Sequence, residues 1–320
     1  VSVPSLPVAG RATRDAAMSE NLLEVKELVK DYTVGRGRRK EVHRAVDHVS
    51  FDVAEGEVLG LVGESGSGKS TTARCLLRLI EPTSGEVRFA GTDVLMDGGH
   101  AVKKLRSQMQ MVFQDPYSSL DPRMRVEDII AEGMIIHGTY KSKTQRRDRV
   151  VELLDLVGLQ ADQLRRRPVQ FSGGERQRIG IARALALNPR LLVCDEPVAS
   201  LDVSIQAQIL NLFKKLQSDL SLTILYIAHD LATVRFLCDR VAVMHNGVIQ
   251  EIGELKQIYE APESVYTREL LAAVPVPDPR VQRRKYAERR ALFATTAKNA
   301  EGIPRNQTDV TSPTAMTGSQ

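Results

Sequence analysis

Apolar and polar residues alternate in two stretches near the beginning of the chain, and this pattern predicts two strands with one buried face each. Leu23 and Val25 carry the alternation in residues 22–30, and it returns in residues 45–53 after a loop rich in glycine and charge. A third strand is expected at residues 86–89, directly after a Pro-Thr-Ser-Gly turn. The chain therefore has a β-rich beginning.

Four other runs are short and apolar, and they predict buried strands. Two of them, residues 191–194 and 222–228, lack alternation, which is typical of parallel sheets covered on both faces. Residues 240–250 predict a hairpin, because two β-rich arms flank Asn246-Gly247, a type I′ turn signal. The remaining apolar runs are residues 57–63 and 109–113, and residues 69–80 show the apolar spacing of a helix.

Helical periodicity replaces the strand signals between about residues 115 and 187. An α/β core is therefore interrupted by a helical subdomain and then resumes. We expect one α/β domain at residues 18–275, with the helical subdomain at about 115–187. Residues 1–17 are expected to be a disordered leader, and residues 276–320 a basic, disordered tail.

The composition is that of an ordinary globular protein, with 42% hydrophobic and 26% charged residues. The chain has no apolar run of about 18 residues, the length of a transmembrane helix, and no secretory signal pattern. Residues 276–320 carry eight Lys or Arg and four Asp or Glu, which accounts for the net charge of +4. The rest is neutral, so no nucleic-acid partner is expected. The spacing of Cys75, Cys194 and Cys238 favours a reducing compartment without disulfides or zinc.

Candidate chemistry begins with residues 63–70, Gly-Glu-Ser-Gly-Ser-Gly-Lys-Ser, which match a phosphate-binding P-loop between a strand and a helix. The glycines let backbone N–H groups close around phosphate oxygens, and the helix start adds a positive dipole. Lys69 can reach the β- and γ-phosphates of ATP, and the Ser70 hydroxyl can bind Mg²⁺. The alternative, a chance glycine-rich turn, does not explain this context. The residues predicted to bind nucleotide here are Gly63, Glu64, Ser65, Gly66, Ser67, Gly68, Lys69, Ser70 and Thr71.

A second feature is the apolar strand at residues 191–196, which ends in two carboxylates. A buried strand of this kind delivers Asp195 to a metal ion at its carboxyl end. Glu196 is then near the γ-phosphate, where it can polarise the attacking water. A solvated strand end would be the default for this pattern alone, but the P-loop upstream favours the catalytic role.

A third feature lies at residues 171–178, where Ser172, Gly173 and Gly174 open a predicted helix. Two glycines at a helix start expose N–H groups to an anion, so they predict a second phosphate site. One ATP has one γ-phosphate, and a second such site therefore suggests contact with the nucleotide of another molecule. In isolation, a glycine-capped helix with no special role would be the simpler interpretation.

These motifs, together with Gln114, Asp202 and His229, occur in the order found in ABC-transporter ATPases, and residues 22–275 resemble that family. The resemblance implies a P-loop NTPase fold of the α/β class, with a parallel-sheet core, an antiparallel β-subdomain and an inserted helical subdomain. It also implies a head-to-tail dimer that holds two ATP molecules, each between the P-loop of one subunit and the signature of the other.

The resemblance also assigns roles to single residues. Gln114 matches the glutamine that senses Mg²⁺ and links to the membrane subunits, and His229 matches the switch histidine at the γ-phosphate. Asp202 matches the residue that couples the two sites, and Tyr32 matches an aromatic residue that stacks on adenine. Taken alone, Gln114 would be a surface glutamine, His229 a turn residue and Tyr32 a packing residue. The implied catalytic set is Glu196, His229, Lys69 and Gln114, and the implied Mg²⁺ ligands are Ser70, Gln114 and Asp195.

One position departs from the family pattern, because Glu175 stands where the signature most often has glutamine. A carboxylate near the phosphates and ribose of ATP should repel slightly. Ser172, Gly173 and Gly174 remain, so we expect a working nucleotide site that includes Glu175. Its effect on affinity or dimer strength stays open.

Residues 114–124 and 261–275 resemble the ATPase subunits of dipeptide and oligopeptide importers. This implies an ATP-hydrolysing subunit, peripheral at the cytoplasmic face of the membrane, that powers uptake of peptides or similar small solutes. The implied partners are two permease subunits, a second ABC ATPase subunit and, indirectly, an extracytoplasmic binding protein. The alternatives are an exporter ATPase, an ABC ATPase of DNA repair or translation, and a silent regulatory cassette, which the intact catalytic residues argue against.

Overall fold

The computed structural model describes residues 21–35, 41–95 and 100–273. The chain divides into two compact units, residues 1–271 and 272–320, and the fold described below is that of the first. The leader and the basic tail expected from the sequence lie outside the described residues.

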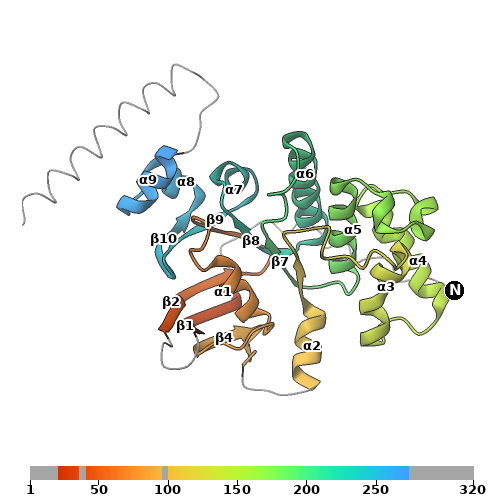
Figure 1. The fold of residues 1–320 in the computed structure, drawn as a ribbon, viewed down its shortest axis with the longest axis horizontal. Helices are drawn as coiled ribbons and strands as arrows, with labels where there is room; N and C mark the ends of the chain where they lie inside the picture. Colours follow the sequence, from red (N-terminus) through yellow and green to blue (C-terminus); the bar gives the residue numbers. More distant parts are fainter. Residues whose placement is uncertain (1–20, 36–40, 96–99, 274–320) are drawn as a thin grey trace, which may run out of the picture. The chain divides into compact units, whose positions relative to one another are not determined.

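An antiparallel sheet with the strand order β2-β1-β4-β5 opens the described chain (Figure 1). Leu23 and Val25, which carry the alternation in the sequence, are buried in β1. All three strands expected here are confirmed, and β1 and β2 extend beyond the predicted residues. The strands are β1 (Asn21–Val34), β2 (Glu41–Ala54), β4 (Ser84–Phe89) and β5 (Thr92–Asp93).

A second, mostly parallel sheet has the order β10-β9-β3-β8-β7-β6. Every residue of β3, β7 and β8 is buried, as expected for strands covered on both faces. The predicted hairpin joins β9 to the antiparallel edge strand β10, and Asn246 and Gly247 have the positive φ angles of a type I′ turn, 47° and 84°. The strands are β3 (Val58–Val62), β6 (Met109–Val112), β7 (Leu191–Asp195), β8 (Thr223–Ala228), β9 (Arg240–His245) and β10 (Val248–Glu254).

The stretch between β6 and β7 contains helices joined by loops and no strand. They are α3 (Val126–His137), α4 (Lys143–Leu156), two short 3₁₀ helices η1 (Ala161–Arg165) and η2 (Pro168–Gln170), and α5 (Gly173–Leu185). The other helices are α1 (Lys69–Leu76), α2 (His100–Gln108), α6 (Val203–Leu220), α7 (Leu231–Leu237), α8 (Leu255–Glu260) and α9 (Val265–Ala273). No helix in the described ranges is long and apolar enough to span a bilayer.

Helix α1 is shorter than the sequence pattern predicts, since it ends at Leu76 and not at Ile80. Arg78 has a φ of 49°, and the backbone N–H groups of Leu79 and Ile80 both donate to the Arg74 carbonyl, at 2.8 and 3.3 Å. Apolar side chains of this turn still pack against the core, so the apolar spacing in the sequence continues after the backbone has ceased to be helical.

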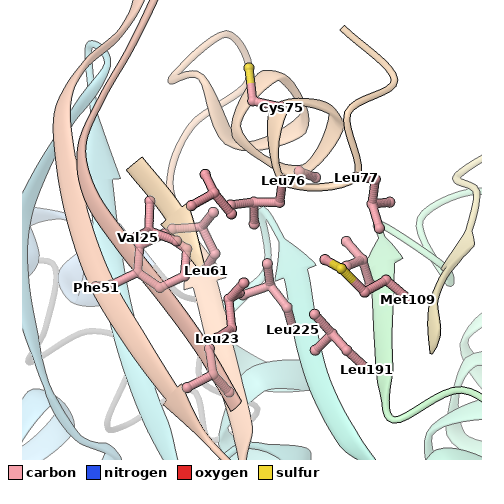
Figure 2. Packing of buried hydrophobic residues seen from close by; sticks show 14 of the residues in the cluster. Leu23, Val25, Phe51, Leu61, Cys75, Leu76, Leu77, Met109, Leu191 and Leu225 are labelled. Atoms are coloured by element: carbon pink, nitrogen blue, oxygen red, sulfur yellow. The ribbon is translucent and has the colours of Figure 1, made fainter. Parts of the chain in front are cut away.

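The main hydrophobic core lies around α1, between the two sheets. Figure 2 shows Leu76 of this helix and Leu77, which follows it, with Leu61 and Leu225 of the parallel sheet and Phe51 of the antiparallel sheet, all members of one buried cluster. Full burial of one leucine contributes about 1.5–3 kcal/mol. The packing therefore anchors α1, and with it the loop that precedes it, against both sheets.

The parallel strands place the predicted chemical residues at one edge of their sheet. The P-loop follows β3, Asp195 ends β7, and His229 follows β8, whereas Gln114 lies two residues after β6. Because β3, β8, β7 and β6 are parallel neighbours, their carboxyl ends meet at the same edge. Ligands of open α/β sheets bind at this edge.

Candidate active site

The P-loop bends tightly between β3 and α1, and two of its glycines are required there. Gly68, at the N-cap of α1, has a φ of 104°, and a Cβ atom on it would collide with the Ala45 carbonyl oxygen. Gly63 has a φ of 156°, and its Cβ would collide with the Met244 carbonyl oxygen. Only glycine fits both the backbone conformation and the space. These two glycines are therefore required because backbone atoms that are distant in sequence pack closely against the loop.

Lys69 lies inside the curl of this loop. Its Nζ atom donates to the carbonyl oxygens of Gly63 and Glu64, both at 2.8 Å, and to Ser67 Oγ at 3.3 Å. Burial lowers the pKa of Lys69, and the carboxylates of Glu196 and Asp195 act in the opposite direction. A buried ammonium that bonds only neutral carbonyls and a hydroxyl is well suited to bind an incoming phosphate.

Ser70 and Asp195 form a direct contact, with 2.7 Å between Ser70 Oγ and Asp195 Oδ1. Asp195 is buried, and this burial raises the pKa of its carboxyl group, although the Ser70 hydroxyl lowers it in part. A hydroxyl and a carboxylate that already touch make an oxygen donor pair of the kind that Mg²⁺ prefers. The charges of Arg74 and Lys69 also lower this pKa, but no described residue forms an ion pair with the carboxylate. These two residues therefore fit a Mg²⁺ ion.

Glu196 follows β7 in an unusual backbone conformation, with a φ of 46° and its N–H donating to the Ile227 carbonyl at 3.0 Å. Its Oε2 atom lies 3.0 Å from His229 Nδ1 and accepts a hydrogen bond of 3.3 Å from Gln114 Nε2. Positive φ in a residue other than glycine is often found at functional sites. Residues that follow two neighbouring strands, β6 and β8, thus orient the carboxylate that follows β7.

Lys69, Ser70 and Glu196 line a cleft of about 580 Å³, and Asp195 lies behind Ser70 and is not part of the lining. The cleft brings together most P-loop residues that the sequence predicts, with Tyr32, Gln114, Glu196 and His229. His43, Ala45 and Ala199 also line it, and sequence reasoning missed them. His43 is paired with Tyr32 across β1 and β2, so only knowledge of this register could have revealed it. The full lining is Tyr32, His43, Ala45, Ser65, Gly66, Gly68, Lys69, Ser70, Thr71, Gln114, Glu196, Ala199 and His229.

Comparison with known proteins identifies the family. Residues 46–199 match the family model described as "ABC transporter". The oligopeptide transport ATP-binding protein OppF of Bacillus subtilis is 51% identical over 275 residues, which cover 85% of this chain and 88% of the relative. The chain belongs to the ABC transporter ATP-binding proteins.

Other relatives agree with this membership. The dipeptide transport ATP-binding protein DppF of Lactococcus lactis is 50% identical, with 83% of this chain and 85% of the relative covered. A dimeric ATP-binding cassette solved in a post-hydrolysis state with ADP and Pi superimposes with a TM-score of 0.65 and 30% identity, covering 73% of this chain and 98% of that one. A cassette of the cbiONQ transporter complex from Clostridium perfringens gives a TM-score of 0.65 and 28% identity, covering 76% and 92%. The predicted fold class is confirmed.

The signature of this ABC protein lies apart from the cleft. None of Ser172, Gly173, Gly174, Glu175 or Asp202 lines the cleft around Lys69. They gather instead where α5 and α6 begin: a Cβ on Gly174 would meet Ile205, and one on Gly173 would approach Leu201. The small residues at the signature therefore allow the turn before α6 to pack closely against α5.

Glu175 is bound within the signature and does not extend freely from it. Ser172 and Glu175 form a capping box at the start of α5, in which Ser172 N and Ser172 Oγ both donate to Glu175 Oε2 at 2.8 Å. The Ser172 backbone N–H is the main cause that lowers the pKa of Glu175. The position that departs from the family pattern thus has a structural role in capping, since glutamate is one of the two residues suited to it.

Proposed function

We propose that this protein is the ATP-hydrolysing subunit of an ABC transporter that imports peptides or similar small solutes. The observation that carries the proposal is the convergence, at one cleft, of a P-loop lysine, a serine that is bonded to Asp195 behind it, and a carboxylate held by Gln114 and His229. This set contains the groups that bind a triphosphate and direct water at its γ-phosphate.

Each group has a task that follows from its position. The P-loop N–H groups and Lys69 bind the phosphates and stabilise the charge that develops on them. Ser70 and Asp195 would hold Mg²⁺, which when bound neutralises phosphate charge. Glu196 orients the attacking water and accepts its proton, and the hydrogen bonds to its Oε2 atom set the direction of the carboxylate. Tyr32, at the far side of the cleft, supplies an aromatic face for adenine.

The second half of each nucleotide site is proposed to come from a second ABC ATPase subunit. Ser172, Gly173 and Gly174 form the start of α5, which lies outside the cleft around Lys69 and is free to meet a phosphate held elsewhere. In a head-to-tail dimer, this helix start faces the γ-phosphate bound by the other subunit, and Asp202 lies at the same interface. The matching cassette structures are dimeric, which supports a dimer of such subunits.

The permease subunits are proposed to dock next to Gln114. A groove of about 320 Å³ lies there, lined among others by the exposed side chains of Phe113, Leu79 and Ile136. Clustered exposed apolar residues mark an interaction surface. If the permease contacts Phe113, its movement would be transmitted to the Glu196 carboxylate through the next residue, Gln114. We place the protein at the cytoplasmic face of the membrane for this reason, with an extracytoplasmic binding protein as the indirect partner.

ATP hydrolysis is tested with two substitutions in the full chain. Lys69→Ala should weaken ATP binding itself, because it removes a buried phosphate ligand. Glu196→Gln keeps size and hydrogen bonding but loses basicity, so binding should persist while steady-state hydrolysis falls by about 10²-fold or more. Near-normal turnover by Glu196→Gln would refute the assigned base.

Transport is tested in cells that contain the permease and the partner ATPase. Uptake of a labelled peptide should stop when the chain carries Lys69→Ala. Normal peptide uptake together with impaired efflux of another solute would favour an exporter. Normal uptake and efflux, with a defect in DNA repair or translation, would favour a non-transport ABC ATPase.

A further inference from the structure

The segment from Ala261 to Ala273 has no part in the cleft, yet it packs against the other side of the P-loop. The sequence of residues 261–275 resembles the ending of peptide-importer ATPases, but this resemblance assigns no chemical role to the segment. In the structure, this segment forms the loop before α9 and then α9 itself. None of its described residues lines the cleft around Lys69. Any influence on nucleotide binding must therefore pass through the P-loop backbone.

The start of α9 is held by β10, the antiparallel edge strand of the second sheet. Glu251, on β10, accepts hydrogen bonds from the backbone N–H groups of Glu263 at 2.9 Å and Ser264 at 3.0 Å. The carboxylate therefore satisfies N–H groups at the beginning of the helix, where negative charge is favourable. Tyr266 lies two residues further along, next to His245 at the end of β9.

Tyr266 makes two contacts there. Its ring stacks on the imidazole of His245, with 4.0 Å between the ring centroids and 33° between the planes. Its hydroxyl oxygen is buried next to the backbone of Glu64 in the P-loop, and it makes no hydrogen bond of normal geometry within the described part of the chain. Burial is the main cause that raises the pKa of Tyr266, and the Glu64 backbone N–H acts in the opposite direction.

The turn that Tyr266 supports is itself attached to the P-loop. The Gly247 N–H donates to the Ser67 carbonyl at 3.0 Å, and the Gly247 carbonyl accepts from Asp47 N at 2.9 Å. On the other side of the same turn, the Met244 carbonyl packs so closely on Gly63 that no side chain fits there. A displacement of residues 244–247 would therefore move the backbone of the loop at Gly63 and at Ser67.

From these contacts we propose that Tyr266 is a positioning residue for the P-loop: it holds the β9–β10 turn and Glu64 from behind, so that the loop keeps its phosphate-binding conformation. The proposal rests on the proposed function, since it assumes that the loop binds ATP. It assigns a role to the segment from Ala261 to Ala273, which maintains the nucleotide site without touching the nucleotide.

The test compares three variants of the full chain by ATP affinity, thermal stability and amide hydrogen exchange. Tyr266→Ala should raise the Kd for ATP by about three- to tenfold, the factor expected when a stacked aromatic contact is lost. It should also increase exchange at residues 63–68. Tyr266→Phe keeps the stack and should bind ATP nearly as tightly as the unaltered chain.

Tyr259→Ala is the matched control. Tyr259 is a half-buried tyrosine on α8 whose hydroxyl bonds the Leu231 carbonyl and whose ring lies 5.6 Å from the Arg235 guanidinium, both on α7. Its loss should lower thermal stability to a similar degree while the Kd for ATP stays unchanged. If Tyr266→Ala does not fold, His245→Ala removes the same stack from the opposite side and is judged by the same affinity criterion.

Three results would overturn the proposal. One is an unchanged Kd in Tyr266→Ala or, where that variant fails to fold, in His245→Ala. Another is an equal loss of affinity in Tyr259→Ala, which would reveal general destabilisation. The third is the absence of ATP binding by the unaltered chain, and this result alone would also remove the proposed function. Intact binding by the unaltered chain with no effect of Tyr266→Ala would leave that function in place.

Discussion

His229 Nδ1 lies 3.0 Å from Glu196 Oε2, although the two residues follow different strands and are 33 positions apart in sequence. The Glu196 carboxylate is largely buried, with 14% of its side chain exposed, whereas the His229 ring is 54% exposed. The exposed ring therefore contacts the buried carboxylate from the solvent side. This geometry indicates that His229 controls the orientation of Glu196 at the same time as it faces the cleft.

Replacement of His229 should thus impair hydrolysis more than binding. His229→Ala removes one of two hydrogen bonds to the carboxylate, and a misdirected base can cost about 10²-fold in rate. The kcat for ATP hydrolysis should fall by this order while the Kd for ATP changes little. His229→Asn is the matched control, since its amide can restore part of the contact. A parallel loss of affinity in His229→Ala would instead place the ring at the nucleotide.

Tyr32 offers a test of adenine recognition. It lines the cleft from β1, and the ammonium of Lys30 lies 5.1 Å from its ring centroid. Stacking of a base on an aromatic ring is worth about 1–3 kcal/mol, so Tyr32→Ala should weaken ATP binding by about this amount and Tyr32→Phe should not. Equilibrium binding of ATP to both variants decides the point. Equal affinity of Tyr32→Ala and the unaltered chain would return Tyr32 to a packing role.

The glycines of the P-loop should differ in their tolerance of a side chain. Gly66 and Gly68 both have positive φ, 84° and 104°, but a Cβ on Gly66 meets nothing within 4 Å, whereas one on Gly68 collides with the Ala45 backbone. Gly66→Ala should cost about 1–2 kcal/mol from the left-handed conformation alone. Gly68→Ala should cost clearly more in denaturant unfolding and should abolish ATP binding. Similar unfolding free energies for the two variants would contradict the observed contact.

Glu175 should contribute to stability in a pH-dependent manner. The Ser172 N–H lowers its pKa below the ordinary value of 4.5, so the ionised carboxylate stabilises the folded state. This contribution is fully present above about pH 4.5 and is lost as the pH falls through the lowered pKa. Glu175→Ala should destabilise the protein by about 0.5–2 kcal/mol at pH 7, the range for helix-cap losses, and by less near pH 3. Glu175→Gln preserves the capping box, so its free energy of unfolding at pH 7 should lie between those of the unaltered chain and Glu175→Ala.

The same variants address the nucleotide site of the dimer. In the structure, Glu175 accepts the hydroxyl hydrogen of Ser172, the group predicted to meet the γ-phosphate of the opposing subunit. ATP must compete with Glu175 for this hydrogen. ATP-dependent dimerisation, measured in a Glu196→Gln background, should therefore be tighter with Glu175→Gln. Weaker association would show that the carboxylate supports the interface.

Local sequence patterns determined the elements of the nucleotide site. A strand, a glycine-rich turn and a helix within residues 57–80 are short-range features, because backbone conformation and side-chain spacing depend on near neighbours. The same holds for the apolar strand that ends at Asp195 and for the Asn246-Gly247 hairpin. Local spacing could not show that α1 ends at Leu76, since the apolar repeat continues through the turn that closes the helix.

Only the tertiary structure decided which groups touch. Ser70 and Asp195 are 125 residues apart, and their 2.7 Å contact exists because β3 and β7 flank β8 in register. The register of β1 and β2 brings His43 to the cleft, and the packing of α9 brings Tyr266 to Glu64. Such contacts depend on strand order and on packing between distant segments, and these arise from burial summed over the whole chain. The residues proposed to bind phosphate could thus be predicted from the sequence, whereas the residues that hold them in place depend on the fold.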